Sequence, residues 1–175
     1  MTIGPGDVIA VKTTGWAAWL IRLGARLRGL PGSVNHVVVV HHRDEHGRWI
    51  GLEGRPGGVG WVDCTNYLRS PATVHNGAQP KTEAQRYLVA KAAEKLIGCA
   101  YDWAAIGAEA LYDLGAPLSH IDWSGTNPPL HVICSAYAEW CYRQVKLARP
   151  EPPQGEVLVQ PANWAAWDIA QGWAR

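Results

Sequence analysis

A β-hairpin predicted in the first third of the chain is the feature that most constrains the fold. The stretch Asn35–His42 contains four consecutive valines, and β-branched residues bounded by turn residues favour an extended strand. A turn at Asp44–Gly47 and a returning strand at Arg48–Glu53 follow directly. We therefore expect an antiparallel sheet, in which a turn centred between residues 45 and 46 places Val38 opposite Glu53.

The hairpin brings a histidine and a glutamate into one region. In the predicted register His36 shares a face with Val38 and Val40, and Glu53 is its diagonal neighbour, about 7–8 Å away by Cα. Taken singly, a buried histidine is usually a satisfied core residue, and a glutamate at a strand end is usually solvated. Together on one face, the two are typical of a general base and the carboxylate that orients it.

Three further histidines, His41, His42 and His46, raise the question of a metal site. They flank an exposed turn, and their spacing matches no zinc-binding pattern. The glycines at positions 57, 58 and 60 come without the lysine of a phosphate-binding loop and do not lead into a helix. We therefore predict neither a metal nor an organic cofactor.

A helix is predicted to begin at Cys134. Pro128 and Pro129 cannot lie inside a helix, and apolar or small residues then recur at positions 134, 137, 138, 141 and 145, as on one buried helical face. The unpaired N–H groups and the positive dipole end of the first turn favour a thiolate at Cys134. An inert core cysteine is the alternative, and we assign that role to Cys141 on the same face. About 10.5 Å of helix separates the two residues, which excludes a disulfide between them.

Composition bounds the class of protein. A chain of 175 residues, 47% of them hydrophobic, can bury a full core, and we expect one domain spanning residues 1–175. A net charge of +1 provides no field that would recruit nucleic acid. The four cysteines include no C-x-x-C pair, so we expect neither a disulfide framework nor a structural zinc site.

No targeting signal is recognisable in the sequence. The first ten residues include neither a basic nor an apolar segment, and no apolar run approaches the ~18 residues of a membrane-spanning helix. We expect the product to be cytoplasmic as synthesised. Release of the protein by cell lysis, its delivery by a phage particle and a recycling role in the cytosol all stay open. Its oligomeric state stays open as well.

Local signals predict the remaining elements. Trp16–Leu30 has an apolar face and ends at Gly29 and Pro31, which predicts an amphipathic helix. Such a helix can lie on a membrane surface, but packing on its own domain is the favoured interpretation. The other expected elements are strands at residues 8–11, 59–62 and 72–75, helices at 82–97, 101–114, 134–148 and 163–171, and a turn-rich loop at 115–129 of the kind that often lines binding sites.

The order of these motifs resembles a known family. A Gly-Asp turn and strand come first, then the strand that begins at His36, then Glu53, and then the helix that begins at Cys134. The motifs that match are Gly6–Ile9, Asn35–Val37, Leu52–Glu53, Gly58–Val59, Gly98, Tyr101–Asp102, Cys134–Ser135 and Gln160–Pro161. This order resembles the permuted branch of the NlpC-type papain-like hydrolases, which includes YiiX-like and YebB-like proteins and is related to lecithin:retinol acyltransferase. The resemblance implies an α+β, circularly permuted papain-like domain, in which a small antiparallel sheet or half-barrel packs against helices.

The resemblance also implies the roles of the site residues. Cys134 is expected to be the nucleophile, His36 the base and later the acid, and Glu53 the residue that orients the imidazole, while Tyr101 and Asp102 are expected to bind substrate. The implied protein is a bacterial or phage cysteine peptidase or amidase. Its expected reaction is cleavage of an amide bond in a peptidoglycan peptide through a thioester, without a cofactor.

Two other functions stay open. The first is a lipid acyltransferase or thioesterase of the lecithin:retinol acyltransferase type, with the helix at Trp16–Leu30 facing a membrane. The second is a non-catalytic papain-like binding module, against which the complete set of cysteine, histidine and glutamate argues. Asn35 stands where the family's pattern has Ser or Thr, and the loop at 115–129 is longer than a minimal member needs, so the substrate is open as well.

Overall fold

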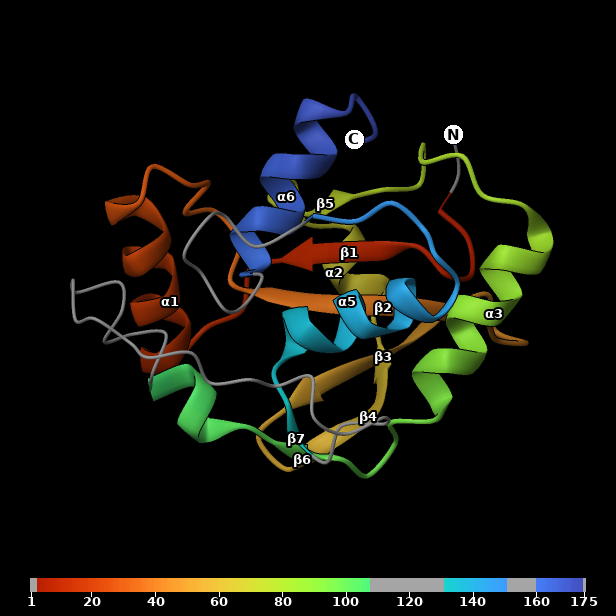
Figure 1. Cartoon of the computed structure of the whole chain (residues 1–175), viewed down its shortest axis with the longest axis horizontal. Helices are drawn as coiled ribbons and strands as arrows, with labels where there is room; N and C mark the ends of the chain where they lie inside the picture. The colour runs from red at the N-terminus through yellow and green to blue at the C-terminus, as the bar shows by residue number, and fades with distance from the viewer. Residues whose placement is uncertain (1–2, 108–130, 151–159, 175) are drawn as a thin grey trace.

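The predicted hairpin forms the centre of the molecule (Figure 1). In a computed structural model, which describes residues 3–107, 131–150 and 160–174, strands β2 (His36–Arg43) and β3 (Trp49–Arg55) pair in antiparallel fashion. Three further strands complete a five-stranded antiparallel sheet of order β4-β3-β2-β1-β5: β1 (Val8–Val11), β4 (Gly58–Asp63) and β5 (Val74–His75). The expected α+β class, with a small antiparallel sheet packed against helices, is confirmed.

The register of the hairpin agrees with the prediction on the side away from the turn. The pairs Val39–Leu52 and Val40–Gly51 have the register that places Val38 opposite Glu53. Closer to the turn, a β-bulge shifts the pairing by one residue, so that Arg43 pairs with Trp49. The shift is confined to the part of the hairpin next to the turn, and the pairing nearer to Glu53 keeps its predicted register.

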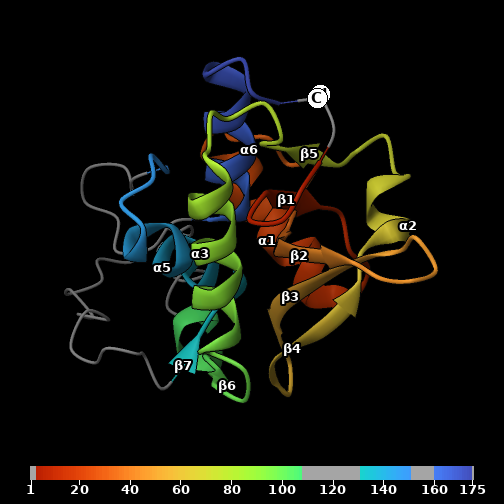
Figure 2. The same ribbon diagram turned by 90° about the vertical axis from the view of Figure 1, so that its right-hand side faces the viewer.

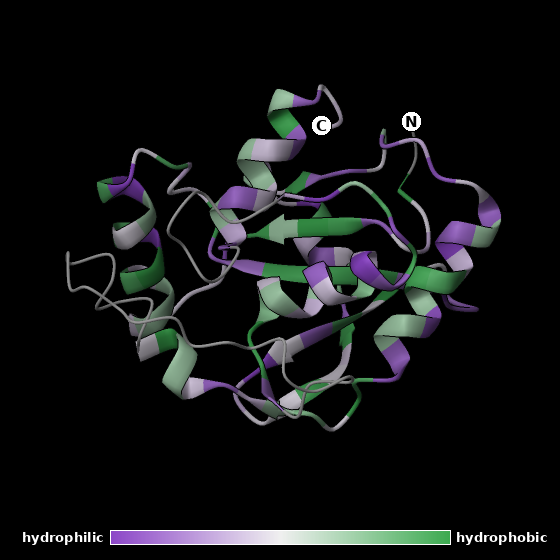
Figure 3. Cartoon of the chain, viewed as in Figure 1, coloured by the Kyte–Doolittle hydropathy of each residue, from purple (hydrophilic) through white to green (hydrophobic). Residues whose placement is uncertain are grey.

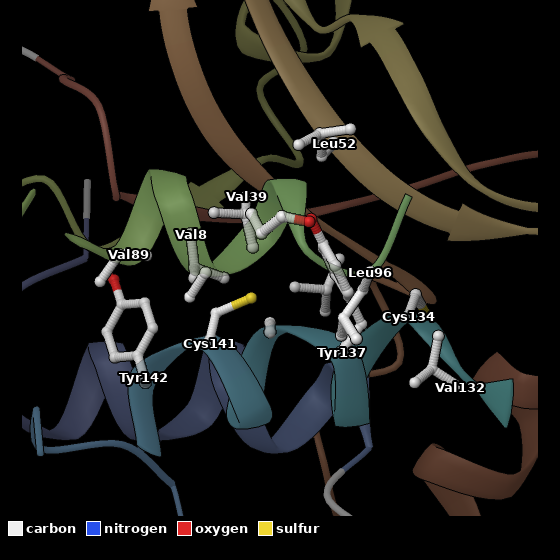
Figure 4. Packing of buried hydrophobic residues seen from close by; sticks show 14 of the residues in the cluster. Val8, Val39, Leu52, Val89, Leu96, Val132, Cys134, Tyr137, Cys141 and Tyr142 are labelled. Atoms are coloured by element: carbon white, nitrogen blue, oxygen red, sulfur yellow. The ribbon is translucent and has the colours of Figure 1, made fainter. Parts of the chain in front are cut away.

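Helices α3 and α5 cover one face of the sheet (Figure 2). Helix α3 (Glu83–Glu94) begins with a capping box formed by Thr82 and Gln85, and α5 (Cys134–Gln144) begins at Cys134. Figure 4 shows side chains of both helices meeting those of the strands in the main hydrophobic cluster. The buried members of this cluster include Val8, Val37, Val39, Leu52, Val89, Leu96, Tyr137, Cys141 and Tyr142.

The opposite face of the sheet carries a second hydrophobic cluster. Helix α2 (Thr65–Leu68), which the sequence analysis did not predict, contributes Tyr67 and Leu68 to it. Because side chains alternate across a strand, β1 and β2 bury residues on both faces, and they are hydrophobic along most of their length (Figure 3). The buried members of this cluster are Ile9, Val11, Val38, Val40 and Cys64.

Two helices lie at the margins of the sheet. Helix α6 (Pro161–Ala170) contacts β1 and β5 and starts two residues earlier than predicted, with the proline in its first turn. Helix α1 (Trp16–Leu27) is confirmed as a helix, but the expectation that its apolar face packs on the domain is wrong for four of its large side chains. The fully buried residues of α1 are small and allow a close approach: Ala18, Gly24 and Ala25. Ile21 and Leu23 are half-buried, and four large apolar side chains are exposed: Trp16, Trp19, Leu20 and Leu27.

A short parallel pair of strands leads the chain into α5. Strand β6 (Ala100–Tyr101) pairs with β7 (His131–Val132), and the N–H of Asp102 donates to the carbonyl of Val132 at 3.2 Å. The helix predicted at 101–114 therefore starts at residue 103, and from residue 108 onward it lies outside the described residues, as does the predicted loop at 115–129. Within the described ranges, the structure contains no helix with the length and apolar character needed to traverse a bilayer.

Candidate active site

Cys134 is the first residue of α5, as the sequence predicts. Ile133 is extended and serves as the N-cap, so the cysteine lies at the positive end of the helix dipole. The end of β3 approaches this point closely, because a Cβ on Gly54 would lie 3.5 Å from the Cα and the backbone nitrogen of Cys134. The glycine thereby brings the neighbouring residue, Glu53, toward the start of the helix.

His36 and Glu53 form a hydrogen-bonded pair. Nε2 of His36 lies 2.8 Å from Oε2 of Glu53, and the two side chains are only 10% and 4% exposed. His36 opens β2 and Glu53 lies near the end of β3, so the hairpin brings them together. In this arrangement the carboxylate fixes the orientation of the imidazole ring and holds a proton on Nε2.

The side chain of Cys134 also acts on the protonation of this imidazole. Because Nε2 is engaged by Glu53, Nδ1 is the ring nitrogen left for the sulfur. Burial by itself lowers the pKa of His36, but the charge and hydrogen bond of Cys134, together with those of Glu53, outweigh burial and raise this pKa to about 10. With this raised pKa, the imidazole of His36 holds its proton at neutral pH.

Arg55 is a residue of this site that the sequence analysis missed. Its NH1 lies 3.3 Å from Oε1 of Glu53, the carboxylate oxygen that does not pair with His36. Arg55 and Glu53 are two residues apart on one strand, so they project to the same side, and this spacing is the signal that could have identified Arg55. The side chain of Arg55 is 51% exposed, which limits the strength of the pair.

The two predicted substrate-binding residues lie beside the strand that leads into Cys134. Asp102 is buried, and its Oδ1 accepts a hydrogen bond from the N–H of Ala105 at 2.8 Å, so it caps the helical residues 103–107. The ring of Tyr101 meets that of Trp103 edge-on, with 5.2 Å between their centroids. A role of either residue in binding substrate stays a prediction.

The other three cysteines have different surroundings. Burial raises the pKa of Cys64 to about 12, and it raises the pKa values of Cys99 and Cys141 as well. Cys141 lies in the main hydrophobic cluster, which confirms the packing role predicted for it. All four cysteines lie in the described part of the chain, and none forms a disulfide.

The histidines near the hairpin turn form a separate group. Nε2 of His41 lies 2.8 Å from a carboxylate oxygen of Glu94, and its Nδ1 lies 2.9 Å from Nδ1 of His42. Among the residues that the structure describes, no group of three or more His, Cys, Asp and Glu side chains is arranged to hold a metal ion. This finding does not test whether the protein needs a metal for its activity, so the expected absence of a metal stays a prediction.

No model of a known protein family matches the sequence, and no curated protein is significantly similar to it. The resemblance to permuted papain-like hydrolases therefore depends on the order of the motifs and on the geometry of this site.

Proposed function

We propose that this protein is a cysteine hydrolase with a circularly permuted papain-like fold. The observation that carries the proposal is the position of one imidazole, His36, between a cysteine side chain at a helix start and a buried carboxylate. A nucleophile next to a base, with the base oriented by a third group, is the general arrangement for nucleophilic catalysis. The chain order of histidine, glutamate and cysteine is that of the permuted branch.

In the first half of the proposed reaction, the thiolate of Cys134 attacks the carbonyl carbon of an amide. The carbonyl oxygen becomes an oxyanion, and the backbone N–H of Cys134, one of the first-turn groups without an intrahelical acceptor, is placed to stabilise it. The imidazolium of His36 then donates its proton to the departing amine as the C–N bond breaks. The products of this half are a free amine and a thioester on Cys134.

In the second half, water replaces the amine. The now neutral imidazole of His36 takes a proton from a water molecule whose oxygen attacks the thioester carbonyl. Collapse of the second tetrahedral intermediate releases a carboxylic acid and the thiolate, and the imidazolium is restored. Glu53 holds the ring in one orientation through both halves, because its Oε2 keeps the hydrogen bond to Nε2.

The substrate that we propose is a peptide of peptidoglycan, as in the hydrolases that the chain resembles. Tyr101 and Asp102 would then lie near the bound peptide. Tyr101 ends β6 and Asp102 follows it, and β6 pairs with β7, the strand that leads into Cys134. A lipid acyltransferase or thioesterase is the second candidate. The exposure of the large apolar side chains of α1 favours it, because an enzyme that takes lipid must reach a bilayer surface.

The proposal is tested by alkylation with iodoacetamide at neutral pH, read by peptide mass spectrometry. We expect Cys134 to be alkylated ahead of the other three cysteines, and roughly tenfold more slowly in His36→Ala, because the imidazolium that stabilises its thiolate is lost. His42→Ala is the matched control and should label like the wild type. Equal labelling of all four cysteines, or labelling of Cys134 that does not depend on His36, would defeat the proposal.

Substrate class is tested separately with the unmodified enzyme. Purified peptidoglycan should release new amino groups, and a thioester on Cys134 should be trapped when the reaction is quenched in acid. Turnover of acyl lipids without release of amino groups from peptidoglycan would favour the second candidate.

A further inference from the structure

Helix α1 presents its large apolar side chains away from the body of the protein. Trp16 is 73% exposed, Trp19 55%, Leu20 42% and Leu27 63%. Positions 16, 20 and 27 fall on one stripe of an α-helix, with 19 beside it, so these side chains form a continuous face. We call this set of four residues the outer face of α1, and Figure 1 shows the helix at the margin of the molecule.

The sequence around the outer face is basic. Between Asp7 and Asp44 there is no acidic residue, whereas Lys12, Arg22, Arg26, Arg28 and Arg43 all fall in this interval. Arg26 is exposed, and because it lies seven residues after Trp19 it borders the apolar stripe on that side; Lys12 is exposed ahead of the helix. The face is therefore apolar at its centre and positive at the edge next to Trp19.

The helix is fixed to the domain by its other cationic side chain. NH1 of Arg22 donates to the carbonyl of Thr13 and to Oδ1 of Asn35, both at 2.8 Å. Asn35 also accepts from the N–H of Thr13 at 2.9 Å, which ties the start of α1 to the residue that precedes His36. The outer face is consequently held in a set orientation at the His36 end of the sheet.

We propose that the outer face of α1 docks the protein onto the surface of an anionic lipid bilayer. Tryptophan prefers the headgroup level and leucine the acyl boundary, which is the composition of this face. Arg26, on the same side of the helix as Trp19, is placed to meet lipid phosphates. A second copy of the chain is a poorer occupant, because symmetric pairing through α1 brings the two sets of cations together. The inference goes beyond the proposed function and does not depend on it, since docking requires no reaction at Cys134.

The test is co-sedimentation of the full chain with vesicles of phosphatidylcholine, alone or mixed with phosphatidylglycerol. We expect binding to the mixed vesicles and a decrease in binding as salt screens the cations. Leu20→Asp should lower the bound-to-free ratio roughly tenfold or more, because it removes an inserted apolar group and adds a repelled charge. Leu88→Asp on α3 is the matched control, since that leucine is 49% exposed on a different helix and should leave binding unchanged.

Three results would overturn the inference. They are no binding to either kind of vesicle, equal loss in Leu20→Asp and Leu88→Asp, and a wild-type dimer that Leu20→Asp converts to a monomer without any vesicle binding. Circular dichroism confirms that each variant is folded. The Cys134→Ala variant should bind vesicles like the wild type, so failure of docking and failure of the proposed hydrolase are separate outcomes.

Discussion

At one end of the β1–β2 pair an imidazole lies between a thiol and a carboxylate, whereas at the other end two cations flank a carboxylate. In the second cluster, Oδ1 of Asp7 lies 2.6 Å from Nζ of Lys81 and 2.7 Å from NH1 of Arg86. Its Oδ2 accepts from the N–H of Gly4 at 2.7 Å. The carboxylate of Asp7 is thus held by two cations and a backbone N–H, and none of these partners is a thiol.

The Asp7 cluster joins parts of the chain that are far apart in sequence. Asn76 accepts from the N–H of Val8 at 2.8 Å and donates to the hydroxyl of Tyr142 at 2.9 Å. That hydroxyl in turn donates to the carbonyl of Gly6 at 2.8 Å. The difference between the two ends teaches that a buried charge cluster serves the fold when its members satisfy one another, and that it becomes a candidate for chemistry when one member is a nucleophile.

The largest expected effect is on the reaction. Cys134→Ala should lower kcat by on the order of 10⁴- to 10⁶-fold, because the nucleophile is removed, while the midpoint of urea unfolding changes little. The pKa of His36, followed by NMR, should fall in this variant, because the charge and hydrogen bond of Cys134 are among the interactions that raise it. A His36 pKa that stays at about 10 without the sulfur would contradict the coupling between the two residues.

The next effect is on stability. Asp7→Ala should lower the free energy of unfolding by roughly 3–5 kcal/mol, because it leaves Lys81 buried without its counter-charge. Urea denaturation measures the loss. The double variant Asp7→Ala/Lys81→Met should recover part of it, because it also removes the buried charge that is left without a partner. The single and the double variant should both keep the kcat of the wild type. A large loss of kcat in either would show that the Asp7 cluster and the candidate active site do not act independently.

Asp168 on α6 gives the Asp7 cluster a pH dependence. Burial raises its pKa from 3.8 to about 8, with the nearby charge of Lys81 opposing this and that of Asp7 adding to it. Because the folded pKa lies above the unfolded one, the contribution of Asp168 to stability is complete below 3.8 and is lost as pH rises through about 8. Relative to Asp168→Asn, the wild type should lose at most about 1.4 kcal/mol per pH unit in that interval. Parallel unfolding curves for the two proteins at every pH would show that Asp168 ionises normally in the fold.

The smallest expected effect concerns Arg55, which acts on the site only through Glu53. Arg55→Ala should lower kcat by no more than about fivefold, the range of a half-exposed ion pair, with KM unchanged and Arg55→Lys recovering most of the loss. Arg48→Ala is the matched control, because Arg48 is also 51% exposed and pairs with Asp44 at the hairpin turn. Equal losses in both variants would show that the Arg55 pair merely stabilises the hairpin.

Much of the candidate site could be predicted from the sequence, because its parts are governed by local rules. Two prolines and a helical apolar pattern placed Cys134 at a helix start, and a hairpin pattern placed His36 and Glu53 on neighbouring strands. The Asp7 cluster could not be predicted, because its partners come from three separate segments and no local pattern couples them.

The orientation of α1 was predicted wrongly for a different reason. Periodicity shows which residues share a face of a helix, but it does not show which face meets the body. In α5 the larger side chains face inward, and in α1 the alanines and a glycine do. The strands β6 and β7 escaped prediction because two-residue strands have no pattern of their own and exist only through their partner.

Because β6 pairs with β7, the position of Cys134 does not depend on how many residues connect the two strands. The polypeptide leaves this small sheet after Tyr101 and re-enters it at His131, two residues before the N-cap of the nucleophile's helix. The start of α5 is therefore fixed by the pairing of β6 with β7, whatever the number of residues that separate the two strands in the sequence.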